Sequence, residues 1–146
     1  MKKNVLKLTI FVLILLTFIG LMTSCKNSIT KEEAKTSIVS FFEAVEIEDY
    51  ETAASLFHVD QPTEAEMLLE YFNDIEEEKN IDFSSGITID RYTRTKSAAY
   101  DIIRGGAYYE VDMILLVGEK ETRVSLEVTI EFIKNDDGFG MYNIHI

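Results

Sequence analysis

The pattern of apolar and polar positions changes twice along the chain. Residues 8–22 form an uncharged apolar run, residues 30–80 carry apolar positions at helical spacing, and the residues after Asn80 alternate between apolar and polar. Apolar residues three and four positions apart share one face of a helix, whereas alternation with period two marks a strand that buries one face. The chain therefore predicts an apolar leader, a helical half and a β half.

Two helices are predicted directly after residue 29. Thr30 and Glu33 have the spacing of a capping box, and the helix that they begin ends near Glu48. Asp49 can cap a short second helix that ends around His58. The first helix buries five residues at helix-face spacing, which are Ala34, Ile38, Phe41, Phe42 and Val45.

A third helix is predicted to begin at Thr63, with Glu66 completing a second capping box. Its apolar face is Ala65, Leu68, Leu69, Phe72 and Ile75. The acidic residues Glu76, Glu77 and Glu78 follow this face, and three carboxylates at a helix C-terminus could attract a cation. Because consecutive residues splay around a helix, a solvated helix end is the favoured interpretation.

The second half predicts an antiparallel sheet. Turn residues at 84–86, 105–106, 118–120 and 136–138 divide it into strands. In the clearest strand, apolar residues at even positions of 124–132 alternate with polar residues at odd positions, namely Arg123, Ser125, Glu127, Thr129 and Glu131. A sheet with one apolar face needs a cover, which the helices supply, so the fold class is α+β.

Two further segments resemble the nuclear transport factor 2-like superfamily, whose members are also described as SnoaL-like or cystatin-like cones. They are DYETAASLF at residues 49–57 and DGFGMYNI at residues 137–144, and the likeness in helix order extends over nearly all of 30–146. The resemblance implies three N-terminal helices packed in the curve of a bent antiparallel sheet. It also implies a space between sheet and helices that can hold a ligand, and dimers formed through the sheet.

The leader has the order of a secretory signal. Three lysines within the first seven residues precede the apolar run, and two small residues separate that run from Cys25, the one cysteine of the chain. Residues 22–25, MTSC, resemble the lipobox that lipoprotein signal peptidase recognises. The resemblance implies cleavage before Cys25 and a diacylglycerol on its sulfur. An uncleaved membrane span is disfavoured, since a span needs ~20 apolar residues.

These features predict a signal peptide at 1–24, a lipidated cysteine and short tether at 25–29, and a nuclear transport factor 2-like domain at 30–146. The expected location is the cell envelope, on the extracytoplasmic side of a bacterial membrane. Cleavage removes three lysines and leaves 11 basic against 26 acidic residues, a formal charge of −15. Such a charge repels nucleic acid phosphates and anionic headgroups, so we expect no nucleic acid partner.

Few residues offer chemistry. His58 could act as a base, but its position favours capping of a helix end or exposure, and His145 lies close to the C-terminus. Asp101 and Asp112 are the best carboxylate candidates, because aromatic neighbours could raise the pKa of a buried acid. Residues 136–138 lack the spacing of a calcium loop. The sequence predicts neither a catalytic residue nor a metal or cofactor.

Tyrosines are frequent in the β half, and Tyr100, Tyr109 and Tyr142 are the candidate ligand-binding residues. Packing within the cone is the alternative. The apolar faces of 109–115 and 124–132 have no polar interruption, which favours core packing over acid–base catalysis. The sequence thus favours a membrane-anchored lipoprotein that binds a protein or small apolar ligand without catalysis. The alternative is an isomerase- or dehydratase-like enzyme that uses Asp101, Asp112 or His58. A homodimer formed through the sheet is a further possibility, although the polar face of the sheet disfavours a large dry interface.

Overall fold

The computed structural model describes residues 28–99 and 106–146. Three helices precede one sheet, which confirms the α+β prediction. The helical elements are α2 (Lys31–Glu46), α3 (Tyr50–Ser55), α4 (Ala65–Lys79) and the 3₁₀ turn η1 (Phe83–Ser85). The strands are β1 (Ile87–Ala99), β2 (Ala107–Val117), β3 (Val124–Asn135) and β4 (Gly138–His145).

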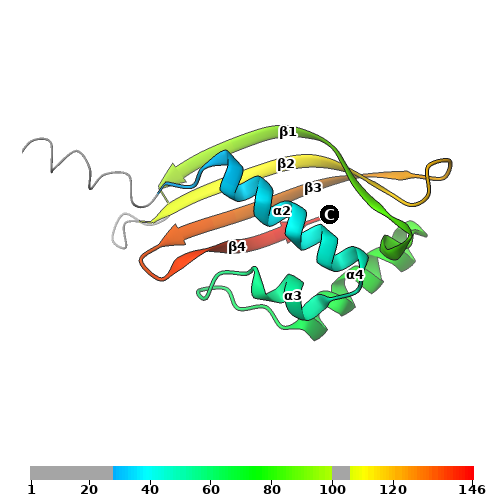
Figure 1. Ribbon diagram of the computed structural model, residues 1–146, viewed down its shortest axis with the longest axis horizontal. Coiled ribbons are helices and arrows are strands. Elements are labelled where there is room, and N and C mark those ends of the chain that lie inside the picture. The colour runs from blue at the N-terminus through cyan, green and yellow to red at the C-terminus, as the bar shows by residue number, and fades with distance from the viewer. Residues whose placement is uncertain (1–27, 100–105) are drawn as a thin grey trace, which may run out of the picture.

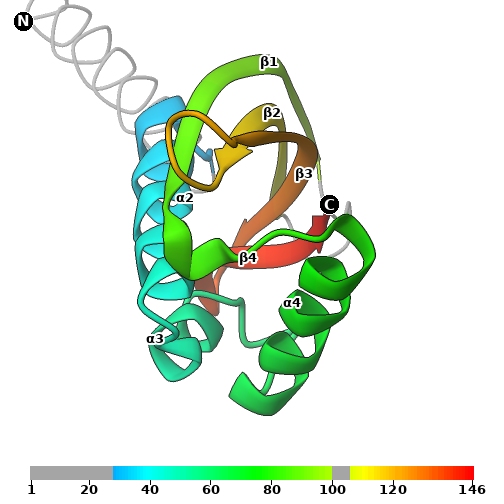
Figure 2. The same ribbon diagram turned by 90° about the vertical axis from the view of Figure 1, so that its right-hand side faces the viewer.

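The sheet is an antiparallel meander in the order β1-β2-β3-β4. Figure 1 shows the four strands side by side with α2 running along them, and the end view in Figure 2 shows the sheet curling from β1 round to β4. Pairing of β2 with β3 is regular, whereas β1 shifts register twice and β4 once. Such extra residues bend a strand, and here they lie in the two outer strands of the curved sheet.

The first two helices begin where the sequence predicts. The Glu33 amide donates to the Thr30 hydroxyl oxygen (3.1 Å) while the Thr30 amide donates to the Glu33 carboxylate (2.9 Å), so the capping box is confirmed. Asp49 accepts a hydrogen bond from the amide of Thr52 (3.0 Å) and caps α3. These caps satisfy amide groups that have no partner inside the helix.

The third helix differs from its prediction at both its start and its face. It begins at Ala65, and its N-cap Glu64 makes no side-chain hydrogen bond, so the predicted Thr63 capping box is wrong. The Thr63 hydroxyl instead reaches back to the carbonyl of Gln61 (3.5 Å). Leu69 is 42% exposed rather than buried. One row, Leu68, Phe72 and Ile75, faces inward, and Leu69 is turned about 100° away from it.

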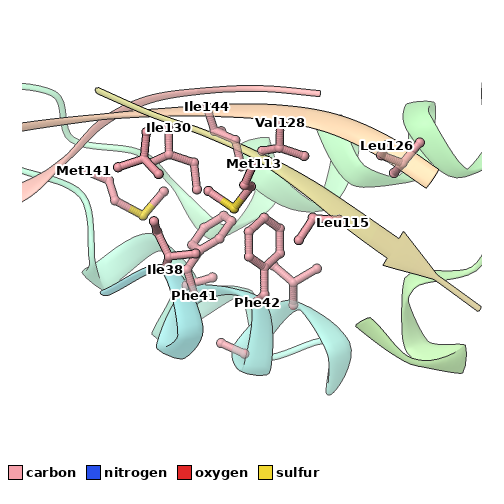
Figure 3. Packing of buried hydrophobic residues seen from close by; sticks show 14 of the residues in the cluster. Ile38, Phe41, Phe42, Met113, Leu115, Leu126, Val128, Ile130, Met141 and Ile144 are labelled. Carbon is pink, nitrogen blue, oxygen red and sulfur yellow. The ribbon is translucent and has the colours of Figure 1, made fainter. Parts of the chain in front are cut away.

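The core lies between α2 and the sheet (Figure 3). The inward faces of β2 and β3 are buried as predicted, with Val124 half-buried at the start of β3. Phe41 is fully buried, and its ring meets those of Phe42 (5.3 Å) and Phe57 (6.1 Å) edge on. Ile29 is also buried in this cluster. Apolar side chains therefore occupy the space that the curved sheet encloses.

Within residues 28–99 and 106–146, no helix has the length and hydropathy needed to cross a membrane.

Candidate functional site

Three of the predicted site residues lie outside the described residues. They are Cys25, Tyr100 and Asp101, together with the whole signal segment 1–24. The lipid attachment at Cys25 therefore stays a prediction.

The two described tyrosines of the predicted ligand site lie on different strands in different surroundings. Tyr109 is 9% exposed, belongs to the core cluster and stands opposite Phe132. Tyr142 is half-buried and is the extra residue of the bulge in β4. One strand, β3, lies between the strands that carry them, β2 and β4.

Asp112, the described carboxylate candidate, lies on the outer face of the sheet and not in the core. Its carboxylate accepts hydrogen bonds from Nε of Arg94 (2.6 Å) and from the hydroxyl of Thr129 (2.9 Å). The Asp112 carboxylate, followed by Glu110, raises the pKa of the Arg94 guanidinium. Asp112 alternates along β2 with buried Val111 and Met113, which explains its outward position.

Tyr108 also forms hydrogen bonds on the outer face of the sheet, a role that the sequence pattern did not predict. Its hydroxyl lies 2.8 Å from Glu110 Oε2 and 3.0 Å from Glu131 Oε1. Burial and the two carboxylates raise the pKa of Tyr108 well above its usual value, so the phenol keeps its proton and shares it between them. The register that pairs Glu110 with Glu131 creates this arrangement, and it is visible only once the strands are aligned.

His58 is buried, with 1% of its surface exposed, so the prediction of exposure or helix capping is wrong. The amide of Asp60 donates to Nδ1 (3.0 Å), which makes Nδ1 the acceptor and leaves the proton on Nε2. Nε2 then donates toward Asn135 Oδ1 (3.1 Å) and the carbonyl of Gly138 (3.2 Å). Both imidazole nitrogens are engaged.

Backbone pairing carries His58 inward. The segment after α3 runs beside β4, where the His58 amide donates to the Met141 carbonyl (2.8 Å) and the Met141 amide donates to the Leu56 carbonyl (2.9 Å). A Cβ on Gly140 would lie 2.6 Å from the His58 backbone nitrogen. The close approach therefore requires glycine at position 140, a requirement without a local sequence signal.

Asn135 completes the polar cluster around His58. Its amide nitrogen donates to Asp60 Oδ2 (2.8 Å), and its Oδ1 also accepts from the amide of Asp137 (2.9 Å). The cluster thus ties the segment after α3 to the β3–β4 hairpin, and the hairpin turn predicted at 136–138 is confirmed. Its hydrogen bonds are structural ones between protein groups.

A surface groove of about 560 Å³ runs beside α2. Thr36, Ser37 and Ser40 of α2 contribute hydroxyls to its lining, and Leu56 and Phe139 contribute apolar surface. Its remaining lining is Thr30, Glu32, Glu33, Ser55 and Gly140. The groove therefore offers hydroxyls beside apolar surface, outside the core.

Glu33, one of the lining residues of this groove, forms an ion pair that links α2 to β3. Lys134 Nζ lies 2.7 Å from Glu33 Oε1. The Lys134 hydrogen bond first, and the Thr30 amide second, lower the pKa of Glu33 to about 2. The carboxylate is thus held ionised by partners within the chain.

The remaining candidates have ordinary surroundings. His145 is exposed, with Nε2 2.9 Å from the side-chain nitrogen of Asn143. In the acidic run, Glu76 accepts a hydrogen bond from the amide of Phe83 (2.7 Å), Glu77 is exposed, and Glu78 pairs with Lys79 (2.6 Å). No group of three or more potential metal ligands occurs among the described residues.

Comparison with known proteins finds no matching family model and no matching curated relative. Similar solved structures include the following two. One is a candidate dehydratase from the NTF2-like family of Streptomyces avermitilis, 17% identical over 78% of this chain and 91% of that chain, with a TM-score of 0.47. The other is an NTF2-like protein with a cystatin-like fold from Novosphingobium aromaticivorans, 11% identical over 89% and 84%, with a TM-score of 0.48. At these values we transfer neither residues nor activity to this chain.

Proposed function

We propose that this chain is an exported lipoprotein, anchored through Cys25 to the extracytoplasmic side of a bacterial membrane, whose domain binds a partner without catalysis. One observation carries the non-catalytic part. Apolar side chains occupy the space enclosed by the curved sheet, and the two buried polar residues of the described part, His58 and Asn135, are hydrogen-bonded to protein groups.

An acid–base enzyme needs a titratable group that a substrate can reach. Asp112 is paired with Arg94 on the outer face of the sheet. His58 is buried and uses both ring nitrogens within the protein. Two of the three residues of the enzyme alternative thus have structural partners, and this supports a binding role.

The anchor proposal rests on the order of lysines, apolar run and small residues before Cys25. Two acyl chains, at ~0.8 kcal/mol for each buried methylene, hold a protein stably at a bilayer. Ile29 is already buried in the domain core. Four residue steps separate Cys25 from Ile29 and span at most ~14 Å, so the domain would stand directly on the membrane surface.

Replacement of the anchor residue tests this address. We expect Cys25→Ser to abolish incorporation of labelled palmitate and to move the protein from membrane to soluble fractions, whereas Ser28→Ala keeps both. A Cys25→Ser protein that stays in the membrane fraction would show that residues 8–22 remain as a span.

Recovery of a partner tests the binding role. Full-length lipidated protein, cross-linked in its own envelope and purified in detergent, should carry a stoichiometric partner that a heat-denatured sample lacks. Recovery of the protein alone, at every cross-linker length, would contradict the binding role.

A further inference from the structure

The two edges of the sheet are covered to different extents. At β4, the segment after α3 adds a parallel bridge between Phe57 and Met141, together with the two backbone hydrogen bonds of Met141 given above. β1 forms the opposite margin of the sheet (Figure 1), and among the described residues it pairs with β2 alone. One edge is thus partly covered by the chain itself, whereas the other is open.

The open part of β1 is its second half. At its beginning, the Ile87 amide donates to the carboxylate of Glu46 in α2 (2.9 Å). Every residue from Thr93 to Ala99 is exposed, so neither face of this segment is covered. Within residues 28–99 and 106–146, the backbone groups of this segment have no hydrogen-bond partner outside the pairing with β2. The amides and carbonyls on the free edge are therefore accessible to another strand.

The same segment is regular enough to accept that strand. Both register shifts of β1 lie before Arg94, and the residues from Arg94 to Ala99 then pair without interruption with the residues from Asp112 back to Ala107. Proteins often protect a free edge with a bulge, a proline or a very short strand. None of these interrupts residues 94–99, so the edge offers an unbroken row of backbone groups.

The charge on this edge is basic, although the chain as a whole is acidic. Residues 93–99 contain Arg94 and Lys96 and no carboxylate. Arg94 is paired with Asp112, whereas Lys96 forms no ion pair with any described residue. Like charges on neighbouring strands repel and opposite charges attract. A second copy would bring the same basic segment to this edge, so the edge is better matched to an acidic strand.

We propose that residues 94–99 pair with an extended, acidic segment of a partner polypeptide, which adds a strand to the sheet at β1. The proposal rests on the binding role proposed above and gives it a partner class. In this mode of recognition, backbone hydrogen bonds supply affinity and alternate side chains supply specificity. An acidic side chain of the partner lies beside Lys96 on the outer face, and its neighbours in the partner lie beside Thr95 and Ser97 on the helix-facing side.

A labelled peptide tests the pairing directly. The probe is a fluorescein-tagged peptide with the core Val-Glu-Val-Glu-Val. One control has lysine in place of both glutamates, and a second control is the acidic peptide with every backbone amide methylated. Full-length lipidated protein in a neutral detergent is titrated into each peptide and followed by anisotropy. We expect saturable binding of the unmethylated acidic probe alone, weakened by added salt.

Hydrogen exchange locates the bound peptide. The acidic probe should slow exchange of the fastest amides in residues 94–99 and leave those of β4 unchanged. Binding without protection of residues 94–99 would overturn the proposal, and so would equal binding of the methylated peptide. A peptide-free dimer in which these amides are already protected would also overturn it, because a second copy would then occupy the edge.

A charge reversal tests the specificity. Lys96→Glu should weaken the acidic probe by about fivefold and confer binding of the basic peptide. Lys120→Glu, in the exposed turn between β2 and β3, makes the same change in net charge and should leave both peptides unaffected. Equal losses in the two variants would overturn the proposal, since overall charge would then govern binding. Unchanged binding by Lys96→Glu would overturn it as well.

The envelope partner separates this proposal from the binding role itself. A partner that cross-links to wild type and is lost from Lys96→Glu supports the pairing at β1. A partner retained in full by Lys96→Glu overturns that pairing and leaves the binding role intact, whereas the absence of any partner contradicts the binding role.

Discussion

The helix-facing side and the outer side of the sheet are built from alternate residues of the same strands. In β2, the inward Val111 and Met113 are almost fully buried and touch apolar groups, whereas the outward Glu110 and Asp112 are half-buried and bind Arg94. Burial of a large apolar side chain stabilises by ~1.5–3 kcal/mol, whereas exposed ion pairs contribute ~0–1 kcal/mol. One face thus supplies stability, and the other mainly keeps the sheet soluble and in register.

The largest expected effect is a cavity on the inner side. Phe41→Ala should lower the free energy of unfolding by ~3–5 kcal/mol, because Phe41 is fully buried among aromatic rings. Urea unfolding measures the change. Val39→Ala on the same helix, where Val39 is 40% exposed, is the control and should change stability by less than ~0.5 kcal/mol. Similar losses for both variants would contradict the assignment of Phe41 to the buried face of α2 and Val39 to its exposed face.

The polar cluster at the margin between the two sides comes next. Asn135→Ala should cost ~1–3 kcal/mol, since it removes an acceptor from His58 and Asp137 and a donor from Asp60. Asn73→Ala, at an exposed position of α4, is the control and should be neutral or slightly stabilising. An unchanged free energy of unfolding in Asn135→Ala would mean that water replaces the lost hydrogen bonds without cost.

The outer face should respond less. Tyr108→Phe keeps the ring and removes the proton shared by Glu110 and Glu131, so we expect a loss of ~1 kcal/mol. Tyr92→Phe is the matched control, because its ring lies under Lys35 and its hydroxyl forms no hydrogen bond to any of residues 28–99 and 106–146. A loss as large as that of Phe41→Ala would overturn the contrast between the faces.

The smallest effect is expected for the Glu33–Lys134 pair, and it depends on pH. Because the folded pKa of Glu33 is lowered to about 2, the unfolded chain binds this proton more readily. The resulting stability is present above the ordinary value of 4.5 and is lost as the pH falls toward 2. Glu33→Gln keeps the cap geometry and should cost no more than ~0.5 kcal/mol near neutral pH, because the side chain is 37% exposed.

Unfolding of wild type and Glu33→Gln across this pH window provides the measurement. The difference between them should shrink as the pH falls from 4.5 toward 2, whereas wild type and Glu32→Gln should not converge in this way. A constant difference for Glu33→Gln would show that its charge has no part in stability.

Local signals in the sequence predicted most of the secondary structure. The caps at Thr30 and Asp49 and the turn at 136–138 act within a few residues, so they are visible without the fold. Alternation likewise predicted the buried faces of β2 and β3, because a strand turns successive side chains to opposite sides. The predicted burial of Leu69 was wrong, because periodicity indicates where the apolar face of a helix lies but not how wide the buried part is. In α4 only a single row of side chains is buried.

The candidate site was much less visible. In the sequence, Asp112 is a carboxylate near aromatic residues, and only the strand register shows that it lies on the outer face, bound to Arg94 and Thr129. In the sequence, His58 looks like a residue at a helix end. Its burial could not be predicted locally, because its segment pairs with a strand more than 70 residues later in the chain.

The sequence by itself determined the class of fold, the caps, the strand faces and the acidic charge, because each follows from neighbouring residues or from composition. It also carries the whole case for the anchor at Cys25. The tertiary structure alone decided the burial of His58 and Ile133 and the need for Gly140. Ile133 breaks the alternation beside buried Phe132, and its partner Gly140 lies against the His58 backbone. These features depend on segments that meet across the fold, and their energies exist only once those segments are in contact.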